Sequence, residues 1–225
     1  MSSTGKIVAT RPHFDSSSEG AERATVAEMH RNAVLHQRIA ANAAVVPAVL
    51  AIRHEHPVRE QDFYRLASNS YLVPPGREQT FAKGLYAGYC RDVSTATHLL
   101  IPQIENAIRV HLEARGVITS GFDRQSRQNE FDLNTTLYME ELTQVFDEDT
   151  IFCLRNILVE HHGTNLRNMM AHGMLDDGEL QSEVALFLWA FTLRLCLTVR
   201  HPQDPNAMRN SAGGPSTVEG QAAPE

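Results

Sequence analysis

The sequence predicts an all-α protein, in which a helical bundle follows additional N-terminal helices and both termini are disordered. Apolar residues recur at helical spacing from about residue 21 to residue 200, and no run alternates as a strand would. Glycine, proline and capping residues interrupt this pattern at the ends of the predicted helices. By contrast, residues 1–20 and 201–225 lack periodicity and are rich in small and polar residues. Those two segments cannot bury enough apolar surface to offset the entropy of ordering them.

The N-terminal helical region, residues 21–91, predicts four helices separated by prolines and glycines. They span about residues 21–44, 47–56, 58–67 and 77–90. Pro47 suits the first turn of the second helix, and Pro57 ends that helix. Residues 71–76 are expected to form a loop, because consecutive prolines and a glycine disfavour a helix there.

The second region, residues 92–200, predicts a bundle of four to five helices with mostly short connections. The expected helices span about residues 92–116, 134–146, 147–162, 165–172 and 176–200. Residues 117–133 are polar and are expected to form an irregular loop. Asp92 or Ser94 can cap the first helix, and Gly116 suits its C-terminal end. Pro102 lies inside that helix and removes one backbone hydrogen bond, so we expect a kink or a break there.

Composition and charge place the chain among ordinary cytoplasmic proteins. Hydrophobic residues make up 42% of the chain and charged residues 21%, which is typical of a soluble globular protein. The N-terminus has no apolar signal core, and the longest apolar run is shorter than the roughly 20 residues of a membrane span, so no membrane partner is expected. The three cysteines are too far apart to form a CxxC pair, which indicates free thiols in a reducing compartment.

The formal net charge of −7 restricts the nucleic acids that the protein could bind. Proteins that coat a duplex are usually basic, because the neutralisation of phosphates drives their affinity. We therefore expect no binding to duplex DNA. A small site that handles one phosphodiester stays compatible with this charge, since it needs only a few cations.

No metal or nucleotide site is predicted. In His54-Glu55-His56 the glutamate separates the two histidines, and a proline follows. His161 and His162 are adjacent, so their side chains point about 100° apart on a helix. We interpret both pairs as surface or capping residues. The sequence contains no HExxH, GxGxxG or GxxxxGK[ST] motif. No cofactor is therefore expected.

Two clusters of polar residues lie within apolar helices and are candidate site residues. Glu105, Asn106 and Arg109 share one helix, where Glu105 and Arg109 have the i, i+4 spacing of a helical ion pair. This cluster is either a structural pair beside the apolar stripe or a support for a site.

The second cluster is Arg167, Asn168 and His172, in the stretch NLRNMMAHG between Gly163 and Gly173. On a regular helix the Arg167 and His172 side chains lie roughly 140° apart, so spacing alone favours a structural role for both. A helix of about two turns is unstable by itself, so tertiary packing must hold it in place. Such packing would fix the polar side chains on its remaining side.

An arginine followed by a polar residue, with a histidine after four intervening residues, resembles the motif of the HEPN superfamily. HEPN proteins are all-α bundles, and many are metal-independent endoribonucleases of toxin, RNA-processing or antiviral-defence systems. Three segments also resemble a bacterial domain family of unknown function that has an HEPN-like C-terminal region. They are PPGREQTFAKGLYAGYCRD (74–92), HLLIPQIENAIR (98–109) and NLRNMMAHG (165–173). The resemblance extends over about residues 45–200 and implies an HEPN-like bundle at 92–200.

The resemblance implies RNA cleavage by attack of a 2′-hydroxyl on the adjacent phosphate. Arg167 would stabilise the phosphate charge and His172 would transfer protons, because imidazole titrates near pH 6.5. Asn168 would position the phosphate or the histidine, while Glu105, Asn106 and Arg109 would line or brace the cleft. One chain supplies a single histidine, so the resemblance implies a homodimer with a shared cleft and single-stranded or looped RNA as substrate. An antitoxin or another defence-system protein is a further implied partner.

Two alternatives to a ribonuclease stay open at this point. A non-catalytic HEPN-like module would bind RNA or a nucleotide without turnover. A structural dimeric helical protein would bury Arg167 and His172 and pair them within one subunit.

Overall fold

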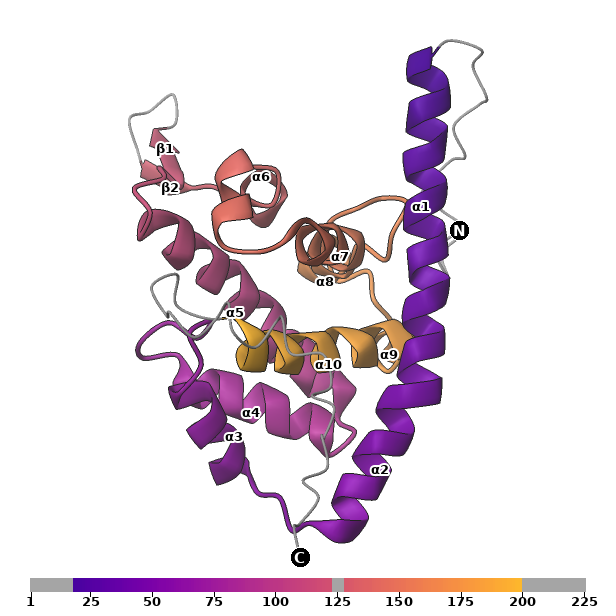
Figure 1. Cartoon of the computed structure of the whole chain (residues 1–225), viewed down its shortest axis with the longest axis vertical. Helices are drawn as coiled ribbons and strands as arrows, with labels where there is room; N and C mark the ends of the chain where they lie inside the picture. The colour runs from indigo at the N-terminus through magenta and orange to yellow at the C-terminus, as the bar shows by residue number, and fades with distance from the viewer. Residues whose placement is uncertain (1–17, 123–127, 200–225) are drawn as a thin grey trace, which may run out of the picture.

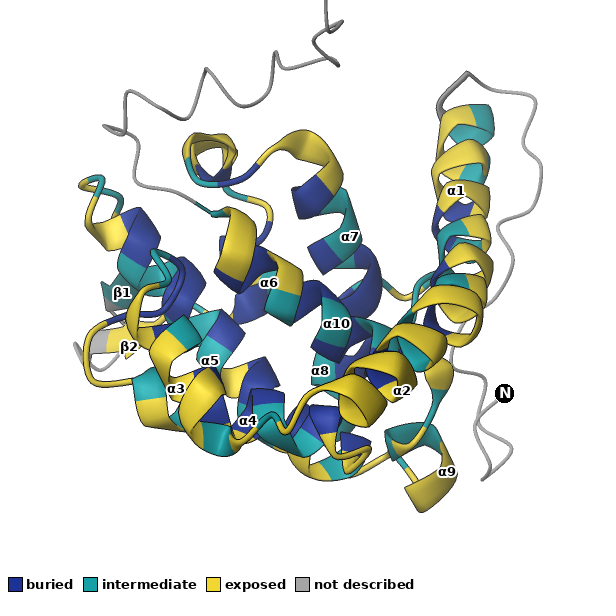
Figure 2. Cartoon of the chain, turned by 60° about the horizontal axis from the view of Figure 1, so that its bottom comes forward, coloured by how far each residue is buried: buried dark blue, intermediate teal, exposed yellow. Residues whose placement is uncertain are grey.

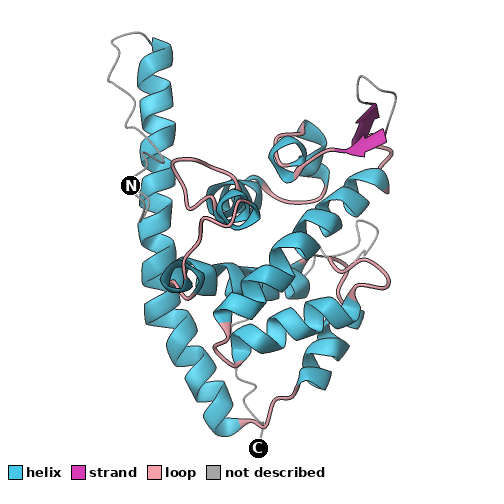
Figure 3. Ribbon diagram, turned by 180° about the vertical axis from the view of Figure 1, so that it is seen from behind, coloured by secondary structure: helices cyan, strands magenta, loops and turns pink. Residues whose placement is uncertain are grey.

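The computed structural model describes residues 18–122 and 128–199, which form the predicted all-α fold (Figure 1). The strands of this part of the chain are one short antiparallel ribbon (Figure 3). The segments predicted to be disordered, residues 1–20 and 201–225, lie outside the described residues, except that Ser18–Gly20 belong to the first helix. The helical fold class is therefore confirmed.

One long helical rod forms an edge of the molecule (Figure 1). It consists of α1 (Ser18–Ala40), the π-helical turn η1 (Ala41–Val45) and α2 (Val46–Glu55), which begins with a proline in its first turn. Residues that face the bundle recur at positions 27, 30, 34, 37 and 41, and then at 45 and 49 instead of 44 and 48. The π turn inserts one extra residue, and this insertion keeps Val49 on the side that faces the bundle.

Three helices follow the rod. They are α3 (Glu60–Ser68), α4 (Glu78–Tyr89) and α5 (Val93–Glu113). The Asp92 carboxylate accepts a hydrogen bond from the Thr95 N–H at 3.1 Å and caps α5, as predicted. Of the kink or break expected at Pro102, the break is absent, since α5 runs through this residue. Gly116 follows the helix with a φ of 79°, a conformation that glycine adopts without strain.

The segment between α5 and α7 differs most from the prediction. The strands β1 (Ser120–Phe122) and β2 (Gln128–Glu130) pair where only a loop was expected. They are too short and too polar to show an alternating pattern. The single helix expected at 134–146 is instead a four-residue helix, α6 (Leu133–Thr136), and a 3₁₀ turn, η2 (Glu140–Gln144). Asp132 caps α6 by accepting from the Thr135 N–H at 2.9 Å.

Four helices complete the described chain. They are α7 (Glu148–Leu158), α8 (Leu166–Ala171), α9 (Asp177–Leu180) and α10 (Glu183–Thr198). Asp147 caps α7 by accepting a hydrogen bond from the Thr150 N–H at 2.7 Å. The last helix was predicted as one element from residue 176 to residue 200, but Ser182 caps α10 separately and divides it from α9. Serine competes with helical backbone hydrogen bonds and therefore favours such a cap.

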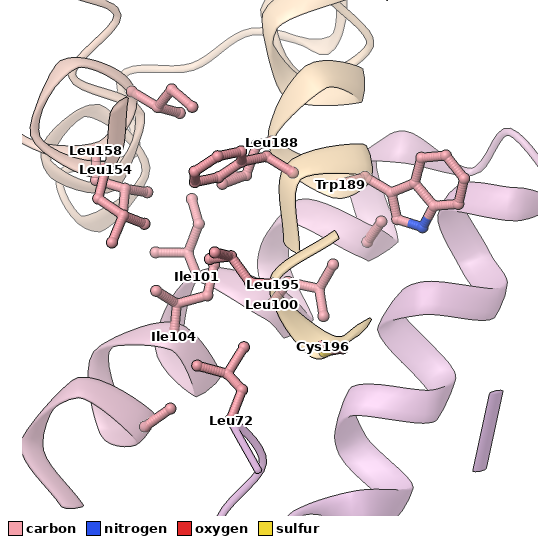
Figure 4. Close-up of a cluster of buried hydrophobic side chains, with 14 of the residues drawn as sticks. Leu72, Leu100, Ile101, Ile104, Leu154, Leu158, Leu188, Trp189, Leu195 and Cys196 are labelled. Atoms are coloured by element: carbon pink, nitrogen blue, oxygen red, sulfur yellow. The ribbon is translucent and has the colours of Figure 1, made fainter. Parts of the chain in front are cut away.

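The core lies where α4, α5, α7 and α10 meet (Figures 2 and 4). Leu100, Ile104, Leu154 and Leu188 are at most 2% exposed. Trp189 packs against α4 because Gly88 has no side chain: a Cβ atom there would lie 2.2 Å from the indole Cδ1. The indole N–H donates to the Leu85 carbonyl at 2.8 Å.

One continuous core includes side chains from both predicted regions, 21–91 and 92–200. The division of the chain into these two regions stays a prediction. Two helical stretches, Gly20–Glu55 and Asp177–Thr198, are long and apolar enough to cross a membrane by length and composition. The most apolar window of the second is 50% buried in the fold, as is typical of a core helix, whereas that of the first is 17% buried.

Candidate functional site

The two predicted clusters meet in space, because Arg167 on α8 reaches Glu105 on α5. The Arg167 guanidinium binds both carboxylate oxygens of Glu105, from Nε to Oε2 at 3.2 Å and from Nη2 to Oε1 at 3.4 Å. The side chains of Arg167 and Glu105 are 21% and 18% exposed. This two-point pairing fixes the guanidinium plane as well as its position. Residues 62 positions apart in the sequence therefore form one ion pair.

Arg109 joins the same carboxylate from the next turn of α5. Its Nη2 atom lies 3.5 Å from Glu105 Oε1 and donates to the Phe131 carbonyl at 3.3 Å. Its Nε atom lies 3.6 Å from a carboxylate oxygen of Glu130. Arg109 thus connects α5 to β2 and to the segment that follows it.

The Asn168 amide uses its full hydrogen-bonding capacity within the protein. Its Nδ2 atom donates to Asn165 Oδ1 at 2.7 Å and to Asn134 Oδ1 at 3.0 Å. Its Oδ1 atom accepts from Asn134 Nδ2 and from Arg167 Nη1, both at 3.2 Å. Two donors and two acceptors are all that an asparagine side chain offers. Asn168 therefore holds Arg167 in place and has no polar group left for a ligand.

Two members of this network, Asn134 and Asn165, were not predicted as site residues. Asn134 and Asn165 are single polar residues outside any spacing motif, and Asn134 lies 34 positions from its partner. Asn165 precedes α8 in a left-handed conformation with φ 55°, which asparagine tolerates better than most residues. Asn165 follows Gly163 closely and precedes the helix, and this pattern could have indicated that the backbone at Asn165 is held in one conformation.

A close backbone contact sets the start of α8. The Thr164 N–H donates to the Asn156 carbonyl at 2.9 Å, and a Cβ atom on Gly163 would lie 2.1 Å from that oxygen. Only glycine fits this contact. Leu166 is 2% exposed and anchors the first turn of α8 in the core.

His172 follows α8 directly and is exposed. Its backbone N–H donates to the Asn168 carbonyl at 3.1 Å and ends the helix, and Gly173 follows with a φ of 63°. Within residues 18–122 and 128–199, its imidazole takes part in no hydrogen bond or ion pair. The Arg167 guanidinium and the His172 imidazole thus have different environments, the first fixed and the second open to solvent.

The remaining predicted residue, Asn106, is half-buried and forms no side-chain hydrogen bond with any other described residue. Asn106 thus lies beside Glu105 in sequence but outside the network.

The charges in the cluster largely cancel. Arg109 and Arg167 face the carboxylates of Glu105, Glu130 and Asp132. Burial opposes the charged form of Asp132, but hydrogen bonds from Thr135 and Asn134 and the nearby Arg167 lower its pKa. Within one chain, this cluster therefore does not form a strongly positive surface.

A metal-binding cluster or a hollow in the surface could also mark a site, and neither is found at these residues. Across the described residues, no group of three or more histidine, cysteine, aspartate or glutamate side chains could hold a metal ion. A hollow of about 500 Å³ lies between α1 and the segment after α7, where Glu22, His30, Glu160 and His162 contribute to its lining. None of the predicted site residues lines it.

Comparisons with protein-family models, with curated proteins and with solved structures found no match to this chain.

Proposed function

We propose that this protein is a metal-independent endoribonuclease of the toxin or defence type, with a composite site formed by two copies of the chain. The observation that carries the proposal is the arrangement at α8. The Arg167 guanidinium is fixed by three hydrogen bonds to Glu105 and Asn168. Five residues later, the exposed His172 imidazole has no partner among the described residues. The likeness of this motif to that of HEPN ribonucleases supports the same chemistry.

The proposed reaction needs a base, an acid and a cation. One His172 removes the proton from a ribose 2′-hydroxyl, and the 2′-oxygen forms a bond to the adjacent phosphorus. The bond from phosphorus to the 5′-oxygen breaks, and the His172 of the second copy donates a proton to that oxygen. The products are a 2′,3′-cyclic phosphate and a 5′-hydroxyl.

Arg167 can stabilise the charge of the phosphorane without leaving Glu105. A guanidinium has five N–H donors, and the bonds to Glu105 and Asn168 use three of them. One donor on each terminal nitrogen therefore stays available for two phosphate oxygens. Asn168 and Glu105 act as positioning residues in this proposal, and Arg109 braces Glu105.

The experiment is RNA cleavage by the purified full-length protein in EDTA, with detection of the cyclic phosphate end. His172→Ala is expected to lower the rate by about 10²–10⁴-fold, the usual contribution of a general acid or base. His98→Ala removes another exposed histidine and is expected to leave the rate unchanged. Undiminished cleavage by His172→Ala would contradict the proposal.

One observation favours a second candidate, the non-catalytic module that binds RNA or a nucleotide. Glu105 already neutralises Arg167, whose side chain is only 21% exposed. Such a module predicts RNA binding that weakens in Arg167→Ala and no cleavage by the wild type. Filter binding and the cleavage assay on the same RNA separate the two candidates.

A further inference from the structure

The hollow between α1 and the segment after α7 is not used by the proposed reaction. Its volume of about 500 Å³ is within the range of small-molecule sites, roughly 300–1,000 Å³. Such sites combine apolar walls with a few fixed polar groups. The described residues that line the hollow include the apolar Val26 and Ala27 and the polar Glu22, His30, Glu160 and His162. The hollow therefore has the composition of a ligand site.

His30 on α1 brings an N–H donor without a partner into the hollow. The residue is only 4% exposed, and its ring stacks on Phe152 with 4.6 Å between the ring centroids. Nδ1 accepts from Asn156 Nδ2 at 3.0 Å, so the neutral ring carries its proton on Nε2. Burial lowers the pKa of His30, which favours the neutral ring at about pH 7. Nε2 bonds to no described residue, and because Asn156 and Phe152 cover other parts of the ring, its N–H points into the hollow.

Glu160 places a carboxylate beside this donor. It lines the same hollow, and it is near enough to His30 for its charge to act on the pKa of that ring. The Tyr138 hydroxyl donates to Glu160 Oε1, and the Arg155 guanidinium lies over the Tyr138 ring, 4.5 Å from its centroid. A carboxylate has about four acceptor sites, of which this bond occupies one. Glu160 is therefore held in position and can still accept two further N–H groups.

We propose that the hollow binds a guanine base. The Watson–Crick edge of guanine has the carbonyl acceptor O6 next to two donors, the N1–H and the N2 amino group. His30 Nε2–H donates to O6, and the two donors of the base bind the carboxylate of Glu160. Unstacked bases are commonly recognised by hydrogen bonds on this edge. Val26 and Ala27 supply the apolar contact for the ring.

The charges around the hollow favour this neutral ligand over an ion. The carboxylates of Glu22 and Glu160 repel an anion, and the exposed Arg23 already takes part in another interaction. The His30 N–H repels a cation, and the described residues contain no group of three or more metal-ligating side chains that could hold a metal ion. Among the four bases, guanine offers a carboxylate two adjacent donors, whereas adenine, cytosine and uracil each offer one. Glu160 thus selects guanine.

The segment after α7 connects the hollow to α8. The Thr164 N–H donates to the carbonyl of Asn156, whose side chain holds His30, and Leu166 then begins α8. In the proposed ribonuclease, the hollow holds a guanine of the same RNA that reaches Arg167, and this link alone rests on the proposed function.

The first test is the binding of guanosine to the full chain, measured by isothermal titration calorimetry. We expect a Kd below about 1 mM. Inosine differs from guanosine only in lacking the N2 amino group, so it should bind about 10-fold more weakly, because it loses a hydrogen bond to a charged group. The trinucleotide UGU, compared with free guanosine, shows whether the hollow prefers a base of RNA or a nucleoside. No binding of guanosine, or equal affinity for inosine, would overturn the inference.

Variants of the lining locate the site. Val26→Trp fills the hollow from a residue that is 45% exposed, so it should abolish guanosine binding without changing the helix content by circular dichroism. Leu35→Trp is the matched control, since Leu35 is 55% exposed on the same helix and does not line the hollow. Glu160→Gln keeps an acceptor for Tyr138 but replaces one acceptor atom by a donor, so it should bind guanosine no more tightly than inosine. Guanosine binding that survives Val26→Trp would contradict the assignment.

A spectroscopic measurement reports on His30 directly. In protein labelled with ¹⁵N-histidine, the Nε2 resonance of His30 should shift when guanosine is added, and it should not shift in Val26→Trp. An unchanged resonance in the wild type at saturating guanosine would place the ligand elsewhere and contradict the proposal.

These measurements do not depend on cleavage. Guanosine binding in the hollow by a protein that cleaves no RNA would contradict the ribonuclease and leave this site intact. RNA cleavage by a protein that does not bind guanosine would do the reverse.

Discussion

At the scale of single residues, the cluster around α8 is defined by how completely its polar groups are paired. Asn168 uses two donors and two acceptors, and Glu105 receives two N–H groups from Arg167 and lies beside Arg109. Buried polar groups cost free energy when they lose a partner, so such a network specifies one arrangement. His172 lies outside the network and is exposed.

Removal of the Glu105 charge is expected to destabilise the fold. Glu105→Gln leaves two largely buried guanidinium groups without a carboxylate between them, which should lower the free energy of unfolding by about 1–3 kcal/mol. The exposed pair of Glu28 and Arg31 is the control, and Glu28→Gln should cost less than about 1 kcal/mol. Urea denaturation measures both variants. Equal losses would show that the Glu105 network contributes no more than a surface ion pair.

Two buried histidines should make stability depend on pH near neutrality. Burial is the main cause that lowers the pKa of His30 and of His111 below their usual values. The unfolded chain therefore binds more protons below about pH 6.5, so this stability is present above that pH and is lost as the pH falls. His111→Gln keeps a donor for the Leu72 carbonyl, which lies 3.1 Å from Nε2, and removes one titrating group. Chemical denaturation between pH 7.5 and pH 5.5, a range of about one unit on either side of that pKa, should show a shallower decline for this variant. An identical slope would contradict the assignment.

At the scale of elements, α8 is placed by contacts with its neighbours rather than by its own helical stability. Asn156 on α7 accepts the Thr164 N–H at its carbonyl, and its side chain binds Gln37 and His30 on α1. Its Nδ2 atom also lies 3.0 Å from His30 Nδ1, which must accept because Nδ2 is a donor. One buried asparagine thus ties together the rod, α7 and the turn before α8.

A side chain at Gly163 should disturb this junction. Gly163→Ala would place Cβ 2.1 Å from the Asn156 carbonyl, so the turn must shift, at a cost of about 2 kcal/mol or more in the free energy of unfolding. Gly178→Ala is the control, because its Cβ would come no closer than 3.3 Å to a side-chain oxygen. Thermal unfolding compares the two. If the protein cleaves RNA, Gly163→Ala should also reduce the rate, since the turn positions α8.

At the scale of the whole molecule, burial divides the chain into a packed bundle and a largely exposed rod. Cys196 belongs to the bundle, Cys153 is half-buried, and Cys90 is exposed at the end of α4. Burial raises the pKa of both Cys153 and Cys196 to about 12. A thiol reacts as its thiolate, so these two should be inert in the folded protein.

The three thiols therefore report on the integrity of the bundle. At pH 8 a water-soluble disulfide reagent should modify Cys90 rapidly and the other two only on unfolding, so one thiol per chain reacts before denaturant and three after. The absorbance of the released thiolate measures the number. Cys90→Ser should abolish the rapid phase, and a rapid phase that persists would show that the bundle is open.

The sequence by itself determined the helical class and the positions of most helices, and it named Glu105, Arg109, Arg167 and Asn168 as candidate residues. Periodicity and caps such as Asp92 and Asp147 are local signals, so they can be identified without the fold. The prediction missed the ribbon of β1 and β2. It also joined α6 to η2 and α9 to α10, each as one helix. Short elements such as these carry little periodic signal.

Only the tertiary structure decided which residues meet. Glu105 and Arg167 lie 62 positions apart, and Asn134 and Asn168 lie 34 apart, distances over which no local pattern constrains the pairing. The packing of α8 against α7 and the bonds from Arg167 to Glu105 on α5 join the two candidate clusters into one network, and His172 stays outside it. The tertiary structure also decides that one side of the long helical rod is buried and the rest is exposed, because burial depends on neighbours that the linear sequence does not name.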